Sequence, residues 1–218
     1  MGKVESGSAV NTEADDAVDV VNIVDVGFGL DGRAVALDYA DRLLQGLLAE
    51  LPWLAGENRV GVHPLAGVSA GNTELYLTRR ARLSLRLPSE YAEAVRRLSG
   101  RKLDLGGEVR IVGEPSEKPL APAKVLYSSF VTVGEQDEER FLAACRQQLV
   151  ELGIGGQMIC GKAKRGSGAN ELWHGFSLML HDLPAEQSLR LQQEGIGSER
   201  KRGCGIFVPH KALAAVVD

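Results

Sequence analysis

The sequence predicts an α+β fold made of two tandem ferredoxin-like domains, which are RRM-like units with the element order βαββαβ. The first observation is the spacing of apolar residues, which follows that order twice within the 218 residues. The second is a segment with three prolines, residues 114–122, which separates the two copies as a linker. The third is a short repeat at an offset of 96 residues, Leu87-Pro88-x-Glu90 against Leu183-Pro184-x-Glu186. We therefore assign residues 18–113 to an N-terminal domain and residues 123–218 to a C-terminal domain.

The elements of the N-terminal domain follow from apolar spacing and from the positions of proline and glycine. Val- and Ile-rich or alternating stretches predict strands, and leucines at helical spacing predict a first helix, which Pro52 ends. A second, short helix follows Pro88 and ends at Gly100. The predicted elements are a strand at 18–30, a helix at 34–51, strands at 59–63 and 74–87 with a loop at 64–72 between them, a helix at 89–98 and a strand pair at 102–112.

The C-terminal domain repeats the same order. Its first helix has acidic residues in its first turn, where they interact favourably with the helix dipole. The predicted elements are a strand at 125–133, a helix at 137–152, a strand at 157–162, a basic hairpin loop at 162–170, a strand at 172–180, a helix at 185–193 and a last strand at 205–208.

Composition and charge limit the classes of protein that fit. The net charge is −4, yet residues 1–41 carry nine acidic and two basic residues, whereas residues 59–110 carry ten basic and five acidic ones. The local positive field of the second region suits an anionic partner. Residues 1–17 are predicted to be a disordered acidic tail that lacks the features of a signal peptide. The chain has no apolar run of about 18 residues for a membrane span, and its scattered cysteines favour the cytoplasm.

A glycine-rich stretch near the C-terminus, residues 195–205, is the strongest binding motif. Two Gly-x-Gly pairs surround three consecutive cations before an apolar strand. Glycines allow the backbone N–H groups to form a concave anion-binding nest, so a nucleic-acid backbone is the expected partner. The alternative is a solvated loop. The candidate RNA-binding residues of this stretch are Gly197, Arg200, Lys201, Arg202, Gly203 and Gly205.

Two further clusters of cations are candidates for binding RNA. One is formed by Lys162, Lys164 and Arg165 in the predicted hairpin loop, where glycines would make a flexible arm that tracks phosphates. A solvated hairpin tip explains that segment equally well. The other cluster is the stretch Arg79-Arg80-Ala81-Arg82 at the start of a long strand, whose three arginines will not all fit in a core.

The glycine-rich stretch resembles the loop of the RAMP superfamily of CRISPR-associated proteins. With Gly61-Val62-His63-Pro64-Leu65 and Arg79-Arg80-Ala81-Arg82-Leu83, the chain is similar over about residues 18–218 to the CRISPR repeat endoribonuclease of the MYXAN subtype. The resemblance implies cleavage of CRISPR precursor RNA at the base of a repeat hairpin, leaving a 2′,3′-cyclic phosphate. The guide RNA product would stay bound, and other subunits of an interference complex would be partners. Alternatives are a non-catalytic RNA-binding subunit and, more distantly, a small-molecule enzyme.

Metal-free RNA cleavage needs groups that move protons, and histidine does so near neutral pH. His63 follows the first helix and precedes a glycine-containing loop, which is where relatives in the family commonly place their catalytic histidine. The alternative is a strand-end histidine with a structural role. Tyr39 in the first helix is either a second catalytic residue or core, and Ser69 is a further possible donor to phosphate. The histidines and carboxylates lack metal-ligand spacing, so neither a metal nor another cofactor is predicted.

Overall fold

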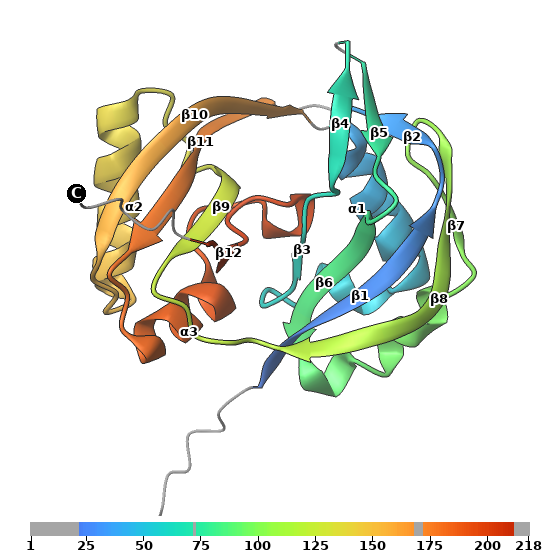
Figure 1. The fold of residues 1–218 in the computed structure, drawn as a ribbon, viewed down its shortest axis with the longest axis horizontal. Coiled ribbons are helices and arrows are strands. Elements are labelled where there is room, and N and C mark those ends of the chain that lie inside the picture. Colours follow the sequence, from blue (N-terminus) through green and yellow to red (C-terminus); the bar gives the residue numbers. More distant parts are fainter. Residues whose placement is uncertain (1–21, 72, 168–171, 212–218) are drawn as a thin grey trace, which may run out of the picture.

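Two antiparallel sheets lie side by side in the computed structural model, which describes residues 22–71, 73–167 and 172–211 (Figure 1). The first sheet has the strand order β3-β6-β1-β8-β7, and the second has the order β10-β11-β9-β12. Both contain the sequence second-third-first-fourth of a βαββαβ unit, which is the ferredoxin-like arrangement that the sequence predicts. Strand β7 extends the first sheet beyond this motif, and a small third sheet has the order β2-β5-β4.

The first half contains most of the short elements. Among its described residues α1 is the one long helix, and leucines of this helix pack in a core with residues of the first sheet. Short 3-10 helices fill the second helical position of the motif. The elements are β1 (Ile23–Asp31), β2 (Ala34–Ala36), α1 (Tyr39–Glu50), η1 (Pro52–Ala55), β3 (Gly61–Val62), β4 (Gly67–Ala70), β5 (Glu74–Leu77), β6 (Arg82–Pro88), η2 (Ser89–Tyr91), η3 (Ala94–Leu98), β7 (Lys102–Asp104) and β8 (Glu108–Pro119).

In the residues that the structure describes, the second half has two regular helices and four strands. Its first helix is capped by Asp137, whose side chain accepts a hydrogen bond from the backbone N–H of Arg140 at 3.1 Å. The elements are β9 (Leu126–Val131), α2 (Glu138–Glu151), β10 (Gln157–Ser167), β11 (Leu172–His181), α3 (Ala185–Glu194), η4 (Arg200–Arg202) and β12 (Val208–Pro209). Within the described ranges, no helix is both long and apolar enough to cross a membrane.

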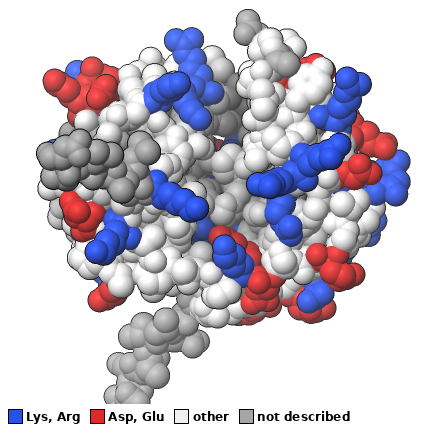
Figure 2. All heavy atoms as spheres, in the orientation of Figure 1, with Lys and Arg blue, Asp and Glu red and all other residues white. Residues whose placement is uncertain are grey.

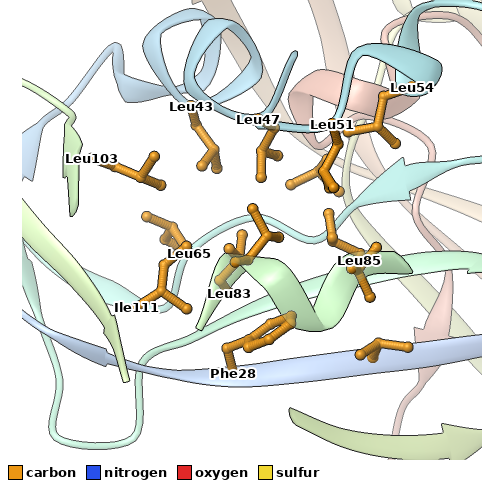
Figure 3. Close-up of a cluster of buried hydrophobic side chains, with 14 of the residues drawn as sticks. Phe28, Leu43, Leu47, Leu51, Leu54, Leu65, Leu83, Leu85, Leu103 and Ile111 are labelled. Carbon is orange, nitrogen blue, oxygen red and sulfur yellow. The ribbon is translucent and has the colours of Figure 1, made fainter. Parts of the chain in front are cut away.

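Each half has its own hydrophobic core, built from alternate residues of its strands and one helix face. In the first half, leucines of α1 lie over leucines of β6 and over Phe28 of β1 (Figure 3). Because side chains alternate across a strand, the residues between these leucines lie on the other face of the first sheet. The second core contains Phe141 of α2 against Phe176 of β11, with ring centroids 4.8 Å apart. The free face of the first sheet is therefore available for contacts with the second half.

The repeat recognised in the sequence marks equivalent positions of the two halves. Pro88 is the last residue of the third strand of the first unit and precedes η2, and Pro184 comes shortly after the third strand of the second unit and precedes α3. Both prolines have nearly the same backbone angles, with φ of −56° and −58°. A proline at the start of a helical turn has no N–H to leave unsatisfied, which suits this position.

Tertiary pairing changes several of the predicted elements of the first half. Residues 34–36, predicted as the start of a helix, form β2 and pair with β5, and residues 67–70 of a predicted loop form β4. The predicted strand 74–87 is divided into β5 and β6 by a turn. Strand β8 continues to Pro119, which pairs with Val24, so much of the predicted linker belongs to the first sheet. Main-chain hydrogen bonds to distant strands outweigh local propensity at these positions.

In the second half, β10 is longer than the sequence predicts. It continues to Ser167, paired with β11 across a β-bulge between Cys160 and Ala163. The cations Lys162, Lys164 and Arg165 therefore lie on a strand, and the prediction that they form a flexible hairpin loop is wrong for these three positions. The predicted tail at 1–17, and residues 168–170 of the predicted loop, lie outside the described residues.

Candidate functional site

A buried arginine joins the two halves. Arg86 of β6 lies opposite Asp25 of β1 in the antiparallel register, on the face of the sheet away from the first core. Its Nε and Nη2 donate to the two carboxylate oxygens of Asp25 at 2.8 and 2.9 Å. Its Nη1 donates to the carbonyl oxygens of Gln192 and Phe207 in the second half, at 3.0 and 2.7 Å. Because Arg86 is 0% exposed, this bidentate pair and its two carbonyl contacts form the centre of the junction.

His63 lies beside this pair. Its backbone N–H donates to the carbonyl oxygen of Ser84 on β6 at 2.9 Å, which places its ring on the same face as Arg86. The ring Nε2 is 3.0 Å from Oδ1 of Asp25, and the side chain is 17% exposed. Burial acts to raise the pKa of Asp25, but the hydrogen bonds from His63 and Arg86 outweigh it and hold this pKa well below its usual range. An ionised carboxylate therefore orients the imidazole.

The glycine-rich stretch packs against α1 and β3 of the first half. Its turn η4 lies between two residues in the left-handed region, Glu199 and Gly203, with φ of 61° and 89°. The N–H groups of Gly197, Gly203 and Gly205 donate to Gln148 Oε1 and to the carbonyl oxygens of Arg200 and Phe130. Because these three N–H groups already donate to acceptors of the protein itself, they do not form the open anion-binding nest that the sequence predicts.

The three cations of this stretch also contact the protein. Arg200 turns inward and donates to the carbonyl oxygens of Gln193 and Glu194, which end helix α3, at 2.9 and 2.5 Å. Burial lowers the pKa of Arg200 to about 10. A cation at the C-terminal end of a helix satisfies carbonyls that have no partner within the helix. Lys201 Nζ lies 3.3 Å from the carbonyl oxygen of Ala55. The structure thus shows Arg200 bracing the end of α3, and its contact with RNA stays a prediction.

Arg202 connects the same stretch to α1. Its Nε and Nη2 donate to Asp41 Oδ1 at 2.9 and 2.8 Å, and its Nη1 donates to Glu199 Oε2 at 2.6 Å. Its guanidinium also lies 5.6 Å from the ring centroid of Trp173 on β11. Arg202 is therefore held in place by two carboxylates and by an aromatic ring.

An open cleft of about 680 Å³ lies between the two halves. Figure 2 shows a hollow between them with Lys and Arg side chains on both sides. The cleft combines apolar, aromatic and basic groups from α1, the segment after β3, β9, β10, β11 and η4. The residues that line it are Leu37, Asp38, Tyr39, Ala40, Pro64, Thr73, Ser129, Phe130, Lys164, Arg165, Gly166, Trp173, Arg202 and Gly203.

Tyr39 and His63 lie close to one another at one end of this cleft. Both line a narrow crevice with Pro64 and residues 201–203, and that crevice shares Tyr39 and Pro64 with the cleft. The Tyr39 hydroxyl accepts a hydrogen bond from the backbone N–H of Leu65 at 2.7 Å, and burial raises its pKa to about 12. The hydroxyl is therefore protonated at neutral pH and keeps its own proton available for donation.

Other predicted RNA-binding residues are placed differently. Arg79 and Arg80 are exposed in the turn between β5 and β6, and not at the start of a long strand. Arg82 donates to the Gly27 carbonyl oxygen and to Ser116 Oγ, both at 2.9 Å. These three arginines and Lys162 lie outside the residues that line the cleft, whereas Lys164 and Arg165 line it.

Sequence analysis missed Asp25, Arg86, Phe130 and Trp173. The signal for the first two was present, because each is a charged residue inside an otherwise apolar strand, at the parity opposite to the core residues. The partners of these charges belong to distant segments. In the parts of the chain that the structure describes, no group of three His, Cys, Asp or Glu side chains is arranged to hold a metal ion.

Comparison with known proteins agrees with this architecture. A protein-family model described as Cas6 Crispr matches residues 24–212. The chain belongs to the Cas6 family. It is 36% identical over 194 residues to the CRISPR-associated endonuclease Cas6 of Myxococcus xanthus (strain DK1622), which corresponds to 88% of this chain and 84% of that protein. The family predicted from the sequence is confirmed, and so is the prediction of an enzyme, because the named relative is an endonuclease.

Solved structures support the fold. A CRISPR-associated protein Cas6 superposes with a TM-score of 0.61 at 12% sequence identity, over 87% of this chain and 99% of its own. A RAMP protein described as binding different RNA substrates also gives a TM-score of 0.61 at 12% identity, over 85% of this chain and 98% of its own. At such low identity the likeness concerns the fold alone, and it confirms the predicted fold class.

Proposed function

We propose that this Cas6-family protein is a metal-independent endoribonuclease that cleaves CRISPR precursor RNA within its repeats. The observation that carries the proposal is the His63–Asp25 pair, 3.0 Å apart, with His63 in the crevice that adjoins a cleft lined by Tyr39, Lys164 and Arg165. It combines an oriented imidazole, a protonated phenol and cations, which are the groups that metal-free RNA cleavage requires. The named relative from Myxococcus xanthus, a CRISPR-associated endonuclease, supports the same activity.

The proposed mechanism assigns one proton transfer to each of two residues. Asp25 holds the proton of the neutral His63 ring on Nε2, which leaves Nδ1 to take the proton of the RNA 2′-hydroxyl. The 2′-oxygen forms a bond to phosphorus, and the bond from phosphorus to the 5′-oxygen breaks. Tyr39 gives its proton to the leaving 5′-oxygen, and the proton on His63 then restores the phenol. The products are a 2′,3′-cyclic phosphate and a 5′-hydroxyl.

Cations of the cleft hold the RNA in this mechanism. Lys164 and Arg165 are exposed on β10 at the cleft, where they contact phosphates. Arg202 also lines the cleft, and it stays paired with Asp41 and Glu199. Phosphate contacts fix position and carry little sequence information. We further propose that the guide RNA product stays bound in the cleft, that other subunits of an interference complex receive it, and that the protein acts in the cytoplasm, where its RNA substrate is made.

One observation favours a second candidate function. His63 is 17% exposed and its Nε2 is already engaged by Asp25, as in a purely structural histidine. A non-catalytic RNA-binding subunit would need the cleft and its cations but not the proton transfers of His63. The two functions differ in one measurable property, because only the endoribonuclease converts repeat RNA into two fragments.

The test of the proposed function is incubation with the cognate repeat RNA in EDTA. We expect cleavage at the same rate as in Mg²⁺, because His63 and Tyr39 supply both proton transfers. Analysis of the fragment ends should find a 2′,3′-cyclic phosphate. Loss of cleavage in the chelator, with recovery on adding Mg²⁺, would contradict the mechanism. Tight RNA binding without cleavage in either buffer would favour the non-catalytic alternative.

Substitution of both Lys164 and Arg165 by alanine should weaken binding of repeat RNA and reduce its dependence on salt. Each lost phosphate contact lowers the slope of log affinity against log salt by about 0.7 for single-stranded RNA, so the slope should fall by about 1.4. The measurement is a series of binding titrations at several salt concentrations. A matched control replaces Arg97 and Arg146, which are exposed on η3 and α2 outside the residues that line the cleft. Equal effects in the two double variants would refute the assignment.

A further inference from the structure

The cleft between the two halves has an aromatic lining that cleavage chemistry does not require. Trp173, Phe130 and Tyr39 all line it, and each is partly exposed. They come from β11, the end of β9 and the start of α1, so both halves contribute. Lys164 and Arg165 lie among the same lining residues. Aromatic rings interleaved with cations are typical of surfaces that bind unpaired nucleotides, because bases stack on the rings while phosphates contact the cations.

Trp173 is fixed in a defined position. It pairs with Gly166 across the β10–β11 ladder, and a Cβ atom built at Gly166 would lie only 2.1 Å from Trp173 Nε1. The indole thus occupies space that any other residue at position 166 would fill. The guanidinium of Arg202 lies 5.6 Å from the centroid of the Trp173 ring, and Arg202 is held in turn by Asp41 and Glu199. A ring whose neighbours are fixed binds a base without first losing conformational freedom.

We infer that the cleft is a stacking site for one unpaired nucleobase, which packs against Trp173. This inference rests on the proposed function. A volume of about 680 Å³ is in the range of small-ligand pockets, and its lining offers rings for a base and cations for the adjoining phosphates. A base-paired helix buries the faces of its bases in the stack, so only an unpaired nucleotide can reach the indole.

The position of the cleft indicates which nucleotide is bound. Tyr39 and Pro64 line both the cleft and the crevice that contains His63. The stacked base therefore belongs to the nucleotide next to the phosphate that is cut. The protein would then require that nucleotide to be unpaired, and would select its substrate by local RNA structure at the cut as well as by phosphate contacts.

The experiment uses tryptophan fluorescence. The chain has two tryptophans, and Trp53 stacks on Tyr91 in the first half, with ring centroids 4.2 Å apart. A Trp53→Phe variant leaves Trp173 as the reporter. We expect a short single-stranded oligoribonucleotide to quench its fluorescence. A long RNA duplex, in which only the two terminal base pairs have an uncovered face, should leave it nearly unchanged at the same phosphate concentration. No quenching by the single strand, or equal quenching by the duplex, would overturn the stacking site.

A second measurement tests the energetics. Trp173→Ala should weaken binding of the single strand by about 5- to 150-fold, the effect expected for loss of one stacked base, whereas Trp173→Phe should retain most of the affinity. The thermal unfolding of each variant shows whether it is folded. Wild-type affinity in a folded Trp173→Ala variant would overturn the inference. Quenching without cleavage of repeat RNA would refute the proposed function and leave the stacking site intact. Cleavage without quenching would refute the stacking site and leave the proposed function intact.

Discussion

Replacement of His63 by alanine should slow cleavage of repeat RNA by about 10²- to 10⁴-fold, the usual contribution of a general acid or base. The affinity for RNA should stay close to that of the wild type, because phosphate contacts dominate binding. Asp25 lies 3.0 Å from the ring and is ionised, so the wild-type imidazole is oriented before RNA binds. Single-turnover cleavage and equilibrium binding of the same RNA separate the two quantities.

Two histidines of the second half are the controls for this variant. His174 lies opposite Arg165 on the β10–β11 ladder, and its carbonyl oxygen accepts a hydrogen bond from Thr132. His181 forms a pair at 2.8 Å with Asp182, which is exposed. Neither lines the cleft or the crevice, so alanine at either position should reduce the rate far less. Cleavage by His63→Ala at the wild-type rate would show that His63 has a structural role and is not the catalytic base.

Arg86→Ala should cause the largest loss of stability of the variants considered. It removes a side chain that is 0% exposed and leaves the carboxylate of Asp25 and the carbonyl oxygens of Gln192 and Phe207 without this donor. Breaking a buried ion pair by removing one partner costs about 3–5 kcal/mol. Denaturant unfolding should show a decrease of that size in the free energy of unfolding.

The control for Arg86 is Arg96→Ala, because Arg96 pairs with Glu93 and Glu114 while its own side chain is 50% exposed. An exposed pair contributes about 0–1 kcal/mol, so this variant should be nearly as stable as the wild type. Similar losses in both variants would show that Arg86 does not join the two halves.

Acid should reduce the difference between Arg86→Ala and the wild type. Burial tends to raise the pKa of Asp25, but the hydrogen bonds from His63 and Arg86 hold it below its usual range in the folded protein. A group with a lowered folded-state pKa contributes stability above its unfolded pKa, and that stability is lost as the pH falls toward the folded value. The difference in free energy of unfolding between Arg86→Ala and the wild type should therefore be smaller below a pH of about 4 than at neutral pH. A difference that grows in acid would contradict this account.

Much of this protein follows from the sequence alone, because the signals are local. The spacing of Leu44, Leu47 and Leu51 is sufficient for an amphipathic helix, and alternation in residues 83–87 is sufficient for a half-buried strand. Two such sets in the same order predict two ferredoxin-like units, and the equivalent prolines at 88 and 184 mark the same place in each. The glycine-rich stretch and the segment around His63 are likewise local, and they were enough to recognise the family.

The tertiary structure decided what the charged residues do. The sequence shows Arg200, Lys201 and Arg202 as free cations, but Arg200 braces the end of α3 and Arg202 pairs with Asp41, which lies 161 residues away along the chain. Asp25 and Arg86 become a pair only through the register of β1 and β6, and pairing of the chain at His63 with β6 brings His63 to them. The contacts of Arg86 with Gln192 and Phe207 require the two halves to dock. Local patterns determine the secondary-structure element of a residue and the face on which its side chain lies, but not the distant residue that this side chain contacts. The partner determines whether a cation is available to RNA or is used to hold the fold together.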